Sequence, residues 1–246
     1  MSDKSFRCFM VSCIVSCCAS LVSVGAIYEK AGFYAGLSVG AGYNAGSLRG
    51  SATEILPDET YNIPNKLSIC GFEKNFCGFV GWMTHLPHEN WLAGIELGIE
   101  KPFYKKHIKA ALEEGDPIFY GDPLYPNCQY KIKTMFIAKL HAKIGKILNE
   151  KWFVYGLVGV DLKKEEISMR EEILGKMKGR KFFLGFAMGL GVEREISENW
   201  RLGLECVNSL YPTRTVKSLN EDRDYRYHTR LKTNSTQVSL RLTYNF

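Results

Sequence analysis

The last eleven residues of the chain, 236–246, alternate between apolar and polar side chains. Val238, Leu240, Leu242, Tyr244 and Phe246 fall on one face, and the residues between them are polar. Successive side chains of a β-strand point to opposite faces, and about 9–11 tilted residues cross a bilayer as a strand. The segment therefore has the period and the length of a membrane-spanning strand that ends on an aromatic residue.

The same alternation recurs upstream and predicts an all-β chain of eight strands. The other seven are expected at 33–43, 76–83, 91–100, 131–144, 152–162, 182–193 and 200–207. In the segment 131–144, Ile132, Thr134 and Phe136 are expected on the lipid-facing side. Met135 and Ile137 are then apolar exceptions on the polar side.

The connections between these strands are of two kinds. Three are short, at 88–91, 149–152 and 197–200, and each ends on the Trp that opens the next strand. Four are long, at 44–74, 103–129, 163–181 and 211–235. Alternation of short and long connections predicts an antiparallel up-and-down transmembrane β-barrel with periplasmic turns and extracellular loops. Trp82, Trp91, Trp152 and Trp200 then lie at the periplasmic end, as an aromatic belt.

The N-terminal residues 1–26 are predicted to be a secretory signal peptide. Lys4 and Arg7 precede an apolar run, and small residues at 24–26 suit cleavage after Ala26. The barrel domain is then expected to comprise 27–246. A lipoprotein cleavage box at 14–17 and a retained anchor helix are alternatives.

Charge and hydropathy exclude two broad classes of protein. Removing Lys4, Arg7 and Asp3 from 32 basic and 26 acidic residues leaves a net charge of +5, too small to indicate a nucleic-acid partner. No later run of even about fifteen apolar residues occurs, which excludes a helical membrane protein. An apolar content of 46% still suits a barrel, because only alternate residues face lipid.

The polar faces of the predicted strands carry charges of both signs. An eight-stranded barrel is just wide enough for side chains to fill, so these residues are expected to form a lumen charge network without a conducting pore. The alternative is a narrow ion path lined by Lys139 and His141. The residues of the network are Glu96, Glu100, Lys139, His141, Asp161, Lys163, Glu193, Arg201, Glu205 and Arg241.

These features together resemble the small eight-stranded outer-membrane β-barrel superfamily of bacteria. The resemblance rests on Gly-Phe-Tyr-Ala-Gly-Leu-Ser-Val-Gly at 32–40, Leu-Gly-Leu-Glu at 202–205 and the terminal Phe246. The superfamily includes the transmembrane domain of outer-membrane protein A and opacity-type surface antigens. The resemblance implies that the terminal strand is the signal read by the barrel assembly machinery. It also implies a non-enzymatic, cofactor-free, surface-exposed protein that serves envelope integrity or host contact.

No motif for metal or nucleotide chemistry stands out. The segment 85–89 contains two His and a Glu, but Pro87 would break the helix that a zinc-protease site requires. Four Cys follow the signal peptide: Cys70, Cys77, Cys128 and Cys206. The sequence leaves two alternatives open for them: a disulfide near the outer rim between Cys70 and Cys77, or between either and Cys128, and free thiols.

The segments 163–181 and 211–235 each carry a net charge of +3 and are the expected place for ligand contact. The residues proposed for binding are Arg214, Lys217, Arg223, Arg226 and Arg230. Such a basic rim attracts lipopolysaccharide phosphates or acidic host glycans. A plainly solvated loop surface is the alternative.

Two other functions are weighed against the adhesin or surface-antigen hypothesis. An outer-leaflet lipid-modifying enzyme requires a His at the outer rim, for which His107 and His228 are the candidates. A secreted carrier of lipocalin type also has eight strands, but its apolar faces point inward around a ligand.

Overall fold

The computed structural model describes residues 31–54, 60–87, 90–103, 105–110, 128–149, 151–171, 175–219 and 225–246. The predicted signal peptide, 1–26, lies outside these ranges. Within them, nine strands form one antiparallel sheet. Their bounds are β1 Gly32–Glu54, β2 Thr60–His85, β3 Trp91–Pro102, β4 Lys105–Ala110, β5 Cys128–Leu148, β6 Trp152–Glu171, β7 Gly175–Ser197, β8 Trp200–Leu219 and β9 Tyr225–Asn245.

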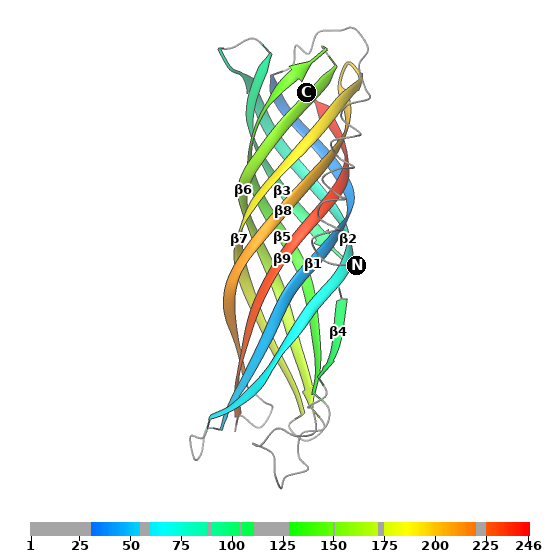
Figure 1. Ribbon diagram of the computed structural model, residues 1–246. Coiled ribbons are helices and arrows are strands. Elements are labelled where there is room, and N and C mark those ends of the chain that lie inside the picture. Colours follow the sequence, from blue (N-terminus) through cyan, green and yellow to red (C-terminus); the bar gives the residue numbers. More distant parts are fainter. Residues whose placement is uncertain are drawn as a thin grey trace.

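The sheet closes on itself into a barrel (Figure 1). Its order is β3-β2-β1-β9-β8-β7-β6-β5-β4, and β3 also pairs with β5. Glu100 of β3 pairs with Ile137 of β5, and Lys105 of β4 pairs with Lys133 farther along β5. Because β3 and β4 occupy the same place in the wall, the ring has eight positions. The predicted eight-stranded up-and-down barrel is confirmed.

The terminal strand is the one that closes the ring. Asn245 of β9 pairs with Tyr34 of β1, and the backbone N–H of Phe246 donates to the carbonyl oxygen of Phe33 at 3.1 Å. Phe246 also packs on Tyr244 with ring centroids 5.1 Å apart, and Tyr244 packs on Trp200 at 5.0 Å. The apolar positions Val238, Leu240 and Leu242 lie on the outer side of β9, since the residues between them are inside.

Trp91, Trp152 and Trp200 open β3, β6 and β8, as predicted from the short turns. Asn90 and Asn149 lie in two of these short turns, and their φ angles are 67° and 48°. This left-handed conformation is one that Asn tolerates better than most residues. Trp82, Trp91 and Trp200 are exposed and Trp152 is half-buried, all toward this end of the barrel.

Three of the four expected long loops, 44–74, 163–181 and 211–235, are mostly strand, so the loop prediction is wrong there. β6 runs to Glu171 and β7 starts at Gly175, inside the expected loop 163–181; β8 and β9 extend likewise to Leu219 and from Tyr225. The alternation of apolar and polar residues along these four strands ends where their outward face becomes polar. The backbone ladder nevertheless continues, because hydrogen bonding between strands does not depend on that face being apolar.

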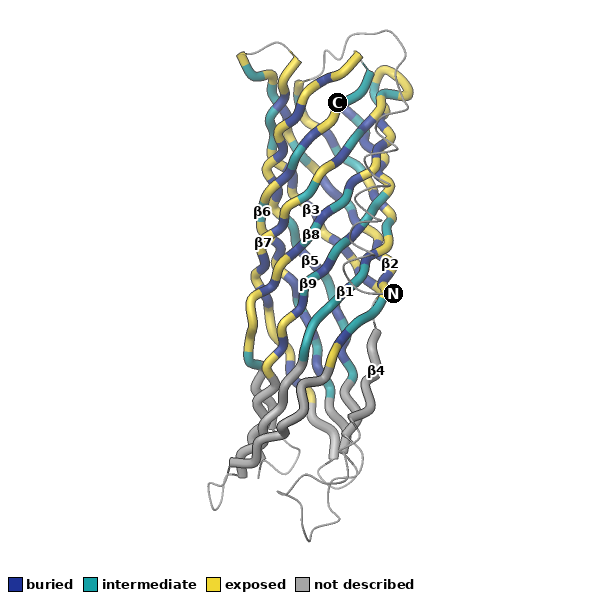
Figure 2. The backbone as a smooth tube through the Cα atoms, viewed as in Figure 1, coloured by how far each residue is buried: buried dark blue, intermediate teal, exposed yellow. Residues whose placement is uncertain are grey.

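The outer surface carries a belt of exposed apolar side chains. Figure 2 shows buried and exposed residues alternating along the strands. Ile99 is 68% exposed and Leu190 is 64% exposed, while their sequence neighbours Glu100 and Gly191 are buried. An apolar surface of this extent on a folded chain marks contact with a membrane or a partner.

One β-bulge corrects the predicted orientation of the first part of β5. The register shifts between Thr134 and Phe136, so Met135 is an extra residue. Before it, Ile132 and Thr134 are buried inside, not lipid-facing as expected; after it, Ile137 is buried inside. A bulge adds one residue to one strand and thereby reverses the faces of a period-two pattern. The two apolar exceptions seen in the sequence mark this reversal.

Large inward side chains fill the lumen over glycines on neighbouring strands. A Cβ on Gly81 would collide with the ring of Tyr34, and a Cβ on Gly191 would collide with the ring of Tyr155. Both tyrosines are buried, at 3% and 2% exposed. Small residues on one strand thus give the aromatic rings of the next strand room to reach the lumen charges.

Candidate functional site

The guanidinium of Arg241 connects distant strands across the lumen. Its Nη2 lies 2.5 Å from Oε2 of Glu96, on β3. Its Nη1 lies 3.0 Å from Oε2 of Glu205, and its Nε lies 3.4 Å from Oε1 of Glu193. The guanidinium also covers the Phe79 ring, with 3.8 Å from Cζ to the ring centroid. One side chain from β9 thus joins β2, β3, β7 and β8.

Two further cations complete what we call the ion-pair cluster. Lys143 Nζ lies 2.7 Å from Oε2 of Glu96 and 3.2 Å from Oε2 of Glu205. Arg201 Nη1 lies 3.1 Å from Oε2 of Glu193. The cluster therefore has three acidic and three basic members, all buried: Glu96, Lys143, Glu193, Arg201, Glu205 and Arg241. Such neutrality is required, because an unpaired charge in this position is strongly destabilising.

Two tyrosines hydrogen-bond the same carboxylates. The Tyr34 hydroxyl donates to Glu96 at 3.0 Å. The Tyr155 hydroxyl lies 2.8 Å from Glu205 and 3.3 Å from Glu193. Lys143 Nζ lies 4.7 Å from the Tyr155 ring centroid. These contacts supply the additional hydrogen bonds that a desolvated ion pair needs.

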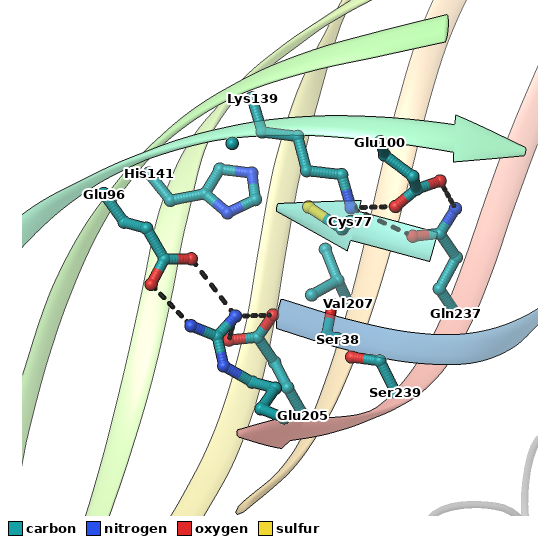
Figure 3. A pocket seen from close by; sticks show the side chains of 12 residues that line it. Ser38, Cys77, Glu96, Glu100, Lys139, His141, Glu205, Val207, Gln237 and Ser239 are labelled. Atoms are coloured by element: carbon teal, nitrogen blue, oxygen red, sulfur yellow. Dashed lines mark hydrogen bonds and ion pairs between the residues drawn. The ribbon is translucent and has the colours of Figure 1, made fainter. Parts of the chain in front are cut away.

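A second group of polar side chains lies beside the cluster (Figure 3). Its Glu100 is farther along β3 from Trp91 than Glu96 is, so the group lies toward the end away from the short turns. Lys139 Nζ is 2.5 Å from Oε2 of Glu100 and donates to Gln237 Oε1 at 3.2 Å. Gln237 in turn donates to Glu100 at 2.9 Å and to Glu73 at 3.2 Å. Glu100, Lys139 and Gln237, with their neighbours, line a cavity of about 10 Å³. That volume is about the space one water molecule requires.

His141, Asp161 and Ser209 also lie together, but not in the order of a nucleophilic triad. His141 Nε2 is 2.9 Å from Asp161 Oδ1, and the Ser209 hydroxyl donates to Asp161 Oδ2 at 2.7 Å. In a triad the His lies between acid and hydroxyl and accepts the hydroxyl proton. Here the carboxylate accepts both bonds, so Ser209 is not activated by His141.

All the residues of the expected lumen charge network lie within the barrel, and Lys139, which is half-buried, is the most exposed. Lys143 is not among the residues that the sequence predicts for this network, although it shares the polar face with Lys139 and His141. It also missed Glu165, which is 2.7 Å from Lys163 Nζ. Continuing the β6 alternation past Leu162 finds it.

The apolar-outward, charged-inward arrangement contradicts the lipocalin-type carrier, whose apolar faces would line the interior. Of the two alternatives for the cysteines, the structure shows the free thiol for Cys77. Its free thiol is buried in the lumen and faces the backbone oxygen of Gly78 at 3.5 Å. Cys70 and Cys77 are seven residues apart on β2, an odd separation that places them on opposite faces. The side chain of Cys128 lies outside the described residues, and Cys206 is a half-buried free thiol on β8.

The residues proposed for loop binding are described only in part. Arg214 and Arg230 are exposed. Lys217 and Arg226 lie in β8 and β9, but their side chains are outside the described residues, as is the whole of Arg223. The side chains of His107 and His228, the enzyme candidates, are also outside them.

No group of three or more His, Cys, Asp or Glu among the described residues is placed to hold a metal ion. No helix in the described ranges is sufficiently long and apolar to cross a membrane.

Comparisons with known proteins show the fold. No protein-family model matches the chain, and no curated protein matches it. The outer-membrane protease OmpT from Escherichia coli aligns with 92% of this chain and 99% of its own, at 10% identity and a TM-score of 0.50. The outer membrane protein OprG from Pseudomonas aeruginosa aligns with 91% and 99%, at 11% identity and a TM-score of 0.54. The chain has the fold of these bacterial outer-membrane β-barrels.

Proposed function

We propose that the protein is a closed, non-enzymatic β-barrel of the bacterial outer membrane that serves as a structural scaffold and presents a basic end to the cell surface. The observation that carries the proposal is the ion-pair cluster around Arg241. It joins wall strands across the lumen, and the cavity beside it has the volume of about one water molecule. Side chains that fill the lumen in this way make the barrel rigid and leave no water-filled path through it.

Export and insertion follow from the same proposal. The signal peptide 1–26 directs the chain across the inner membrane, and the barrel assembly machinery reads the terminal strand ending at Phe246. The apolar belt then contacts membrane lipid, and the Trp residues of the short-turn end lie at the periplasmic interface.

The strand ends opposite the short turns are proposed to act as an adhesin or surface antigen. Arg214 and Arg230 are exposed there, and they suit acidic ligands such as host glycans or lipopolysaccharide. Because binding by clustered Lys and Arg is electrostatic, it should weaken as salt concentration rises.

Conductance measurements test the closed barrel. Purified protein is first checked by electrophoresis with and without boiling, where a heat-dependent mobility shift reports the folded barrel. In planar bilayers we expect no stepwise current from this folded protein. Regular conductance steps from the wild type would instead favour the narrow ion path along Lys139 and His141.

Binding measurements test the surface role. The variant with Arg214→Ser and Arg230→Ser should be retained less by a heparin column, used as an acidic glycan, while its heat-dependent mobility shift remains. The matched control is Lys146→Ser with Arg194→Ser, exposed basic residues toward the short-turn end. Equal retention of the wild type and the Arg214 and Arg230 variant would remove these residues from the proposed binding surface.

A further inference from the structure

A compact basic patch lies on the outward face of β5, β6 and β7, just beyond the apolar belt. We define it by five cations and one acid: Lys131, Lys133, Lys164, Lys178, Arg180 and Glu166. Lys131 and Lys133 point outward because Ile132 and Thr134, which alternate with them, are buried inside. The sequence predicts the basic charge of 163–181 as part of a loop. In the structure Lys164, Lys178 and Arg180 lie in strands, and Lys131 and Lys133 of β5 join them on the same face.

The register arranges the patch in three successive rows across the strands. Phe136, Lys164 and Phe182 are register partners and form the row next to the belt. The second row pairs Lys133, Glu166 and Arg180. The third row pairs Lys131, Ser168 and Lys178. Each row crosses three strands about 4.8 Å apart, and successive rows are two residues, or about 7 Å, apart along β6, so the patch measures roughly 10 by 14 Å.

The first row marks the boundary between apolar and charged surface. The rings of Phe136 and Phe182 pack edge to face with centroids 6.2 Å apart. Lys164 Nζ lies 5.8 Å from the first ring centroid and 5.1 Å from the second. A lysine that extends from aromatic surface toward water is the arrangement favoured at a membrane interface.

The patch remains strongly basic after its internal pairs are counted. Arg180 Nε is 2.8 Å from Glu166 Oε2, and Lys178 Nζ is 3.2 Å from Glu166 Oε1. Partial burial acts to raise the pKa of Glu166, but the hydrogen bonds from Arg180 and Lys178 outweigh it and hold the pKa below its ordinary value. Glu166 is therefore ionised at neutral pH, and five cations against one anion leave +4. Among the described residues, no carboxylate forms an ion pair with Lys131, Lys133 or Lys164.

We propose that this patch binds the phosphate groups of a multiply phosphorylated lipid in the outer leaflet. Phe136 and Phe182 contact its acyl chains, while Lys133 and Lys164 contact phosphate oxygens directly above them. Two phosphates near one headgroup match the +4 charge, and lysine is an effective point-charge partner for phosphate. The inference rests on the proposed membrane location, because the patch is level with the lipid headgroups only if the apolar belt spans the bilayer.

Native mass spectrometry of the full-length mature barrel in neutral detergent tests the proposal, with diphosphoryl lipid A as the probe. Lys133→Gln with Lys164→Gln should weaken lipid binding by roughly tenfold or more, because each basic residue near an anionic membrane surface adds to the attraction. The matched control is Lys146→Gln with Arg194→Gln, exposed cations on β5 and β7 at the opposite end, which should bind like the wild type.

The remaining outcomes each decide something. Equal binding by the patch variant and the wild type, or equal loss in the control, overturns the patch as the site. Competition by inorganic pyrophosphate at the concentrations at which the lipid binds would show a free-anion site and overturn the lipid proposal. A wild-type protein with a heat-dependent mobility shift but no lipid binding overturns this inference alone. A wild type without that shift overturns the proposed barrel scaffold, and this inference with it.

Discussion

Arg241 and Glu96 meet across the lumen although β1 and β2 separate their strands in the wall. Their contacts are paired: Nη1 donates to Oε1 at 3.1 Å, and Nη2 donates to Oε2 at 2.5 Å. A bidentate pair between strands that share no backbone hydrogen bonds fixes the cross-section of the barrel from within. Because both residues are buried, the loss of either one would leave the other as a desolvated, unpaired charge and would destabilise the barrel.

Replacing Arg241 with Met should therefore destabilise the barrel strongly. Three glutamates lose one shared partner, and breaking a buried pair from one side costs about 3–5 kcal/mol. Urea unfolding in lipid vesicles, followed by the heat-dependent mobility shift, measures the change in the free energy of unfolding. Lys146→Met, at an exposed position, is the control. A loss below about 1 kcal/mol for Arg241→Met would contradict the structural role of the cluster.

Gly81→Ala should destabilise the barrel by about 1–3 kcal/mol, the usual cost of overpacking. The new Cβ would meet the Tyr34 ring and displace the hydroxyl that donates to Glu96. Gly78→Ala is the matched control on the same strand, because its Cβ would meet only Leu37 at an ordinary 3.8 Å. The same vesicle unfolding assay compares the two, and equal stabilities would refute the packing argument.

Asn149 tests the turn between β5 and β6. Its φ of 48° is costly for a β-branched residue, so Asn149→Val should lower the free energy of unfolding by roughly 1–2 kcal/mol. Asn149→Gly should leave it nearly unchanged, because Gly adopts this conformation readily. If Val is tolerated as well as Gly, the left-handed turn does not contribute to stability.

Deleting Phe246 should reduce the amount of assembled barrel in the outer membrane. The residue ends the strand that closes the ring, and it combines a backbone hydrogen bond to Phe33 with packing on Tyr244. The measurement is the heat-shifted fraction in isolated outer membranes. Phe103→Ala is the control. Phe103 is also a highly exposed aromatic residue, but it follows the last residue of β3, at the end of the barrel away from Phe246. Normal assembly without Phe246 would rule out the terminal aromatic as the signal.

The sequence predicts the strands best where they cross the belt. There one face of each strand contacts lipid and the other faces a polar lumen. The polarity of a side chain therefore indicates whether it points outward, as Leu240 does, or inward, as Arg241 does. Beyond the belt, both faces of β6 and β7 are polar, as with Lys164 and Glu165, and the period-two signal fades although pairing continues. For this reason the sequence predicts a loop at 163–181 where the structure has largely strand, and it does not predict that the basic residues of this segment share one face with Lys131 and Lys133.

What the sequence alone determined is the eight positions of the ring and, apart from the part of β5 before its bulge, which side chains of the belt-crossing segments point inward, since both follow from local alternation and turn spacing. It did not determine which inward charges meet. Arg241 selects Glu96, Glu193 and Glu205 because closure of the ring and the stagger between strands bring residues from β3, β7 and β8 to one level. The bulge at Met135 likewise acts through register, since one extra residue decides which lysines of β5 face the lumen and which face outward. The ion pairs across the lumen are properties of the closed barrel. Closure alone fixes the distance between strands that are neither consecutive in the sequence nor neighbours in the sheet.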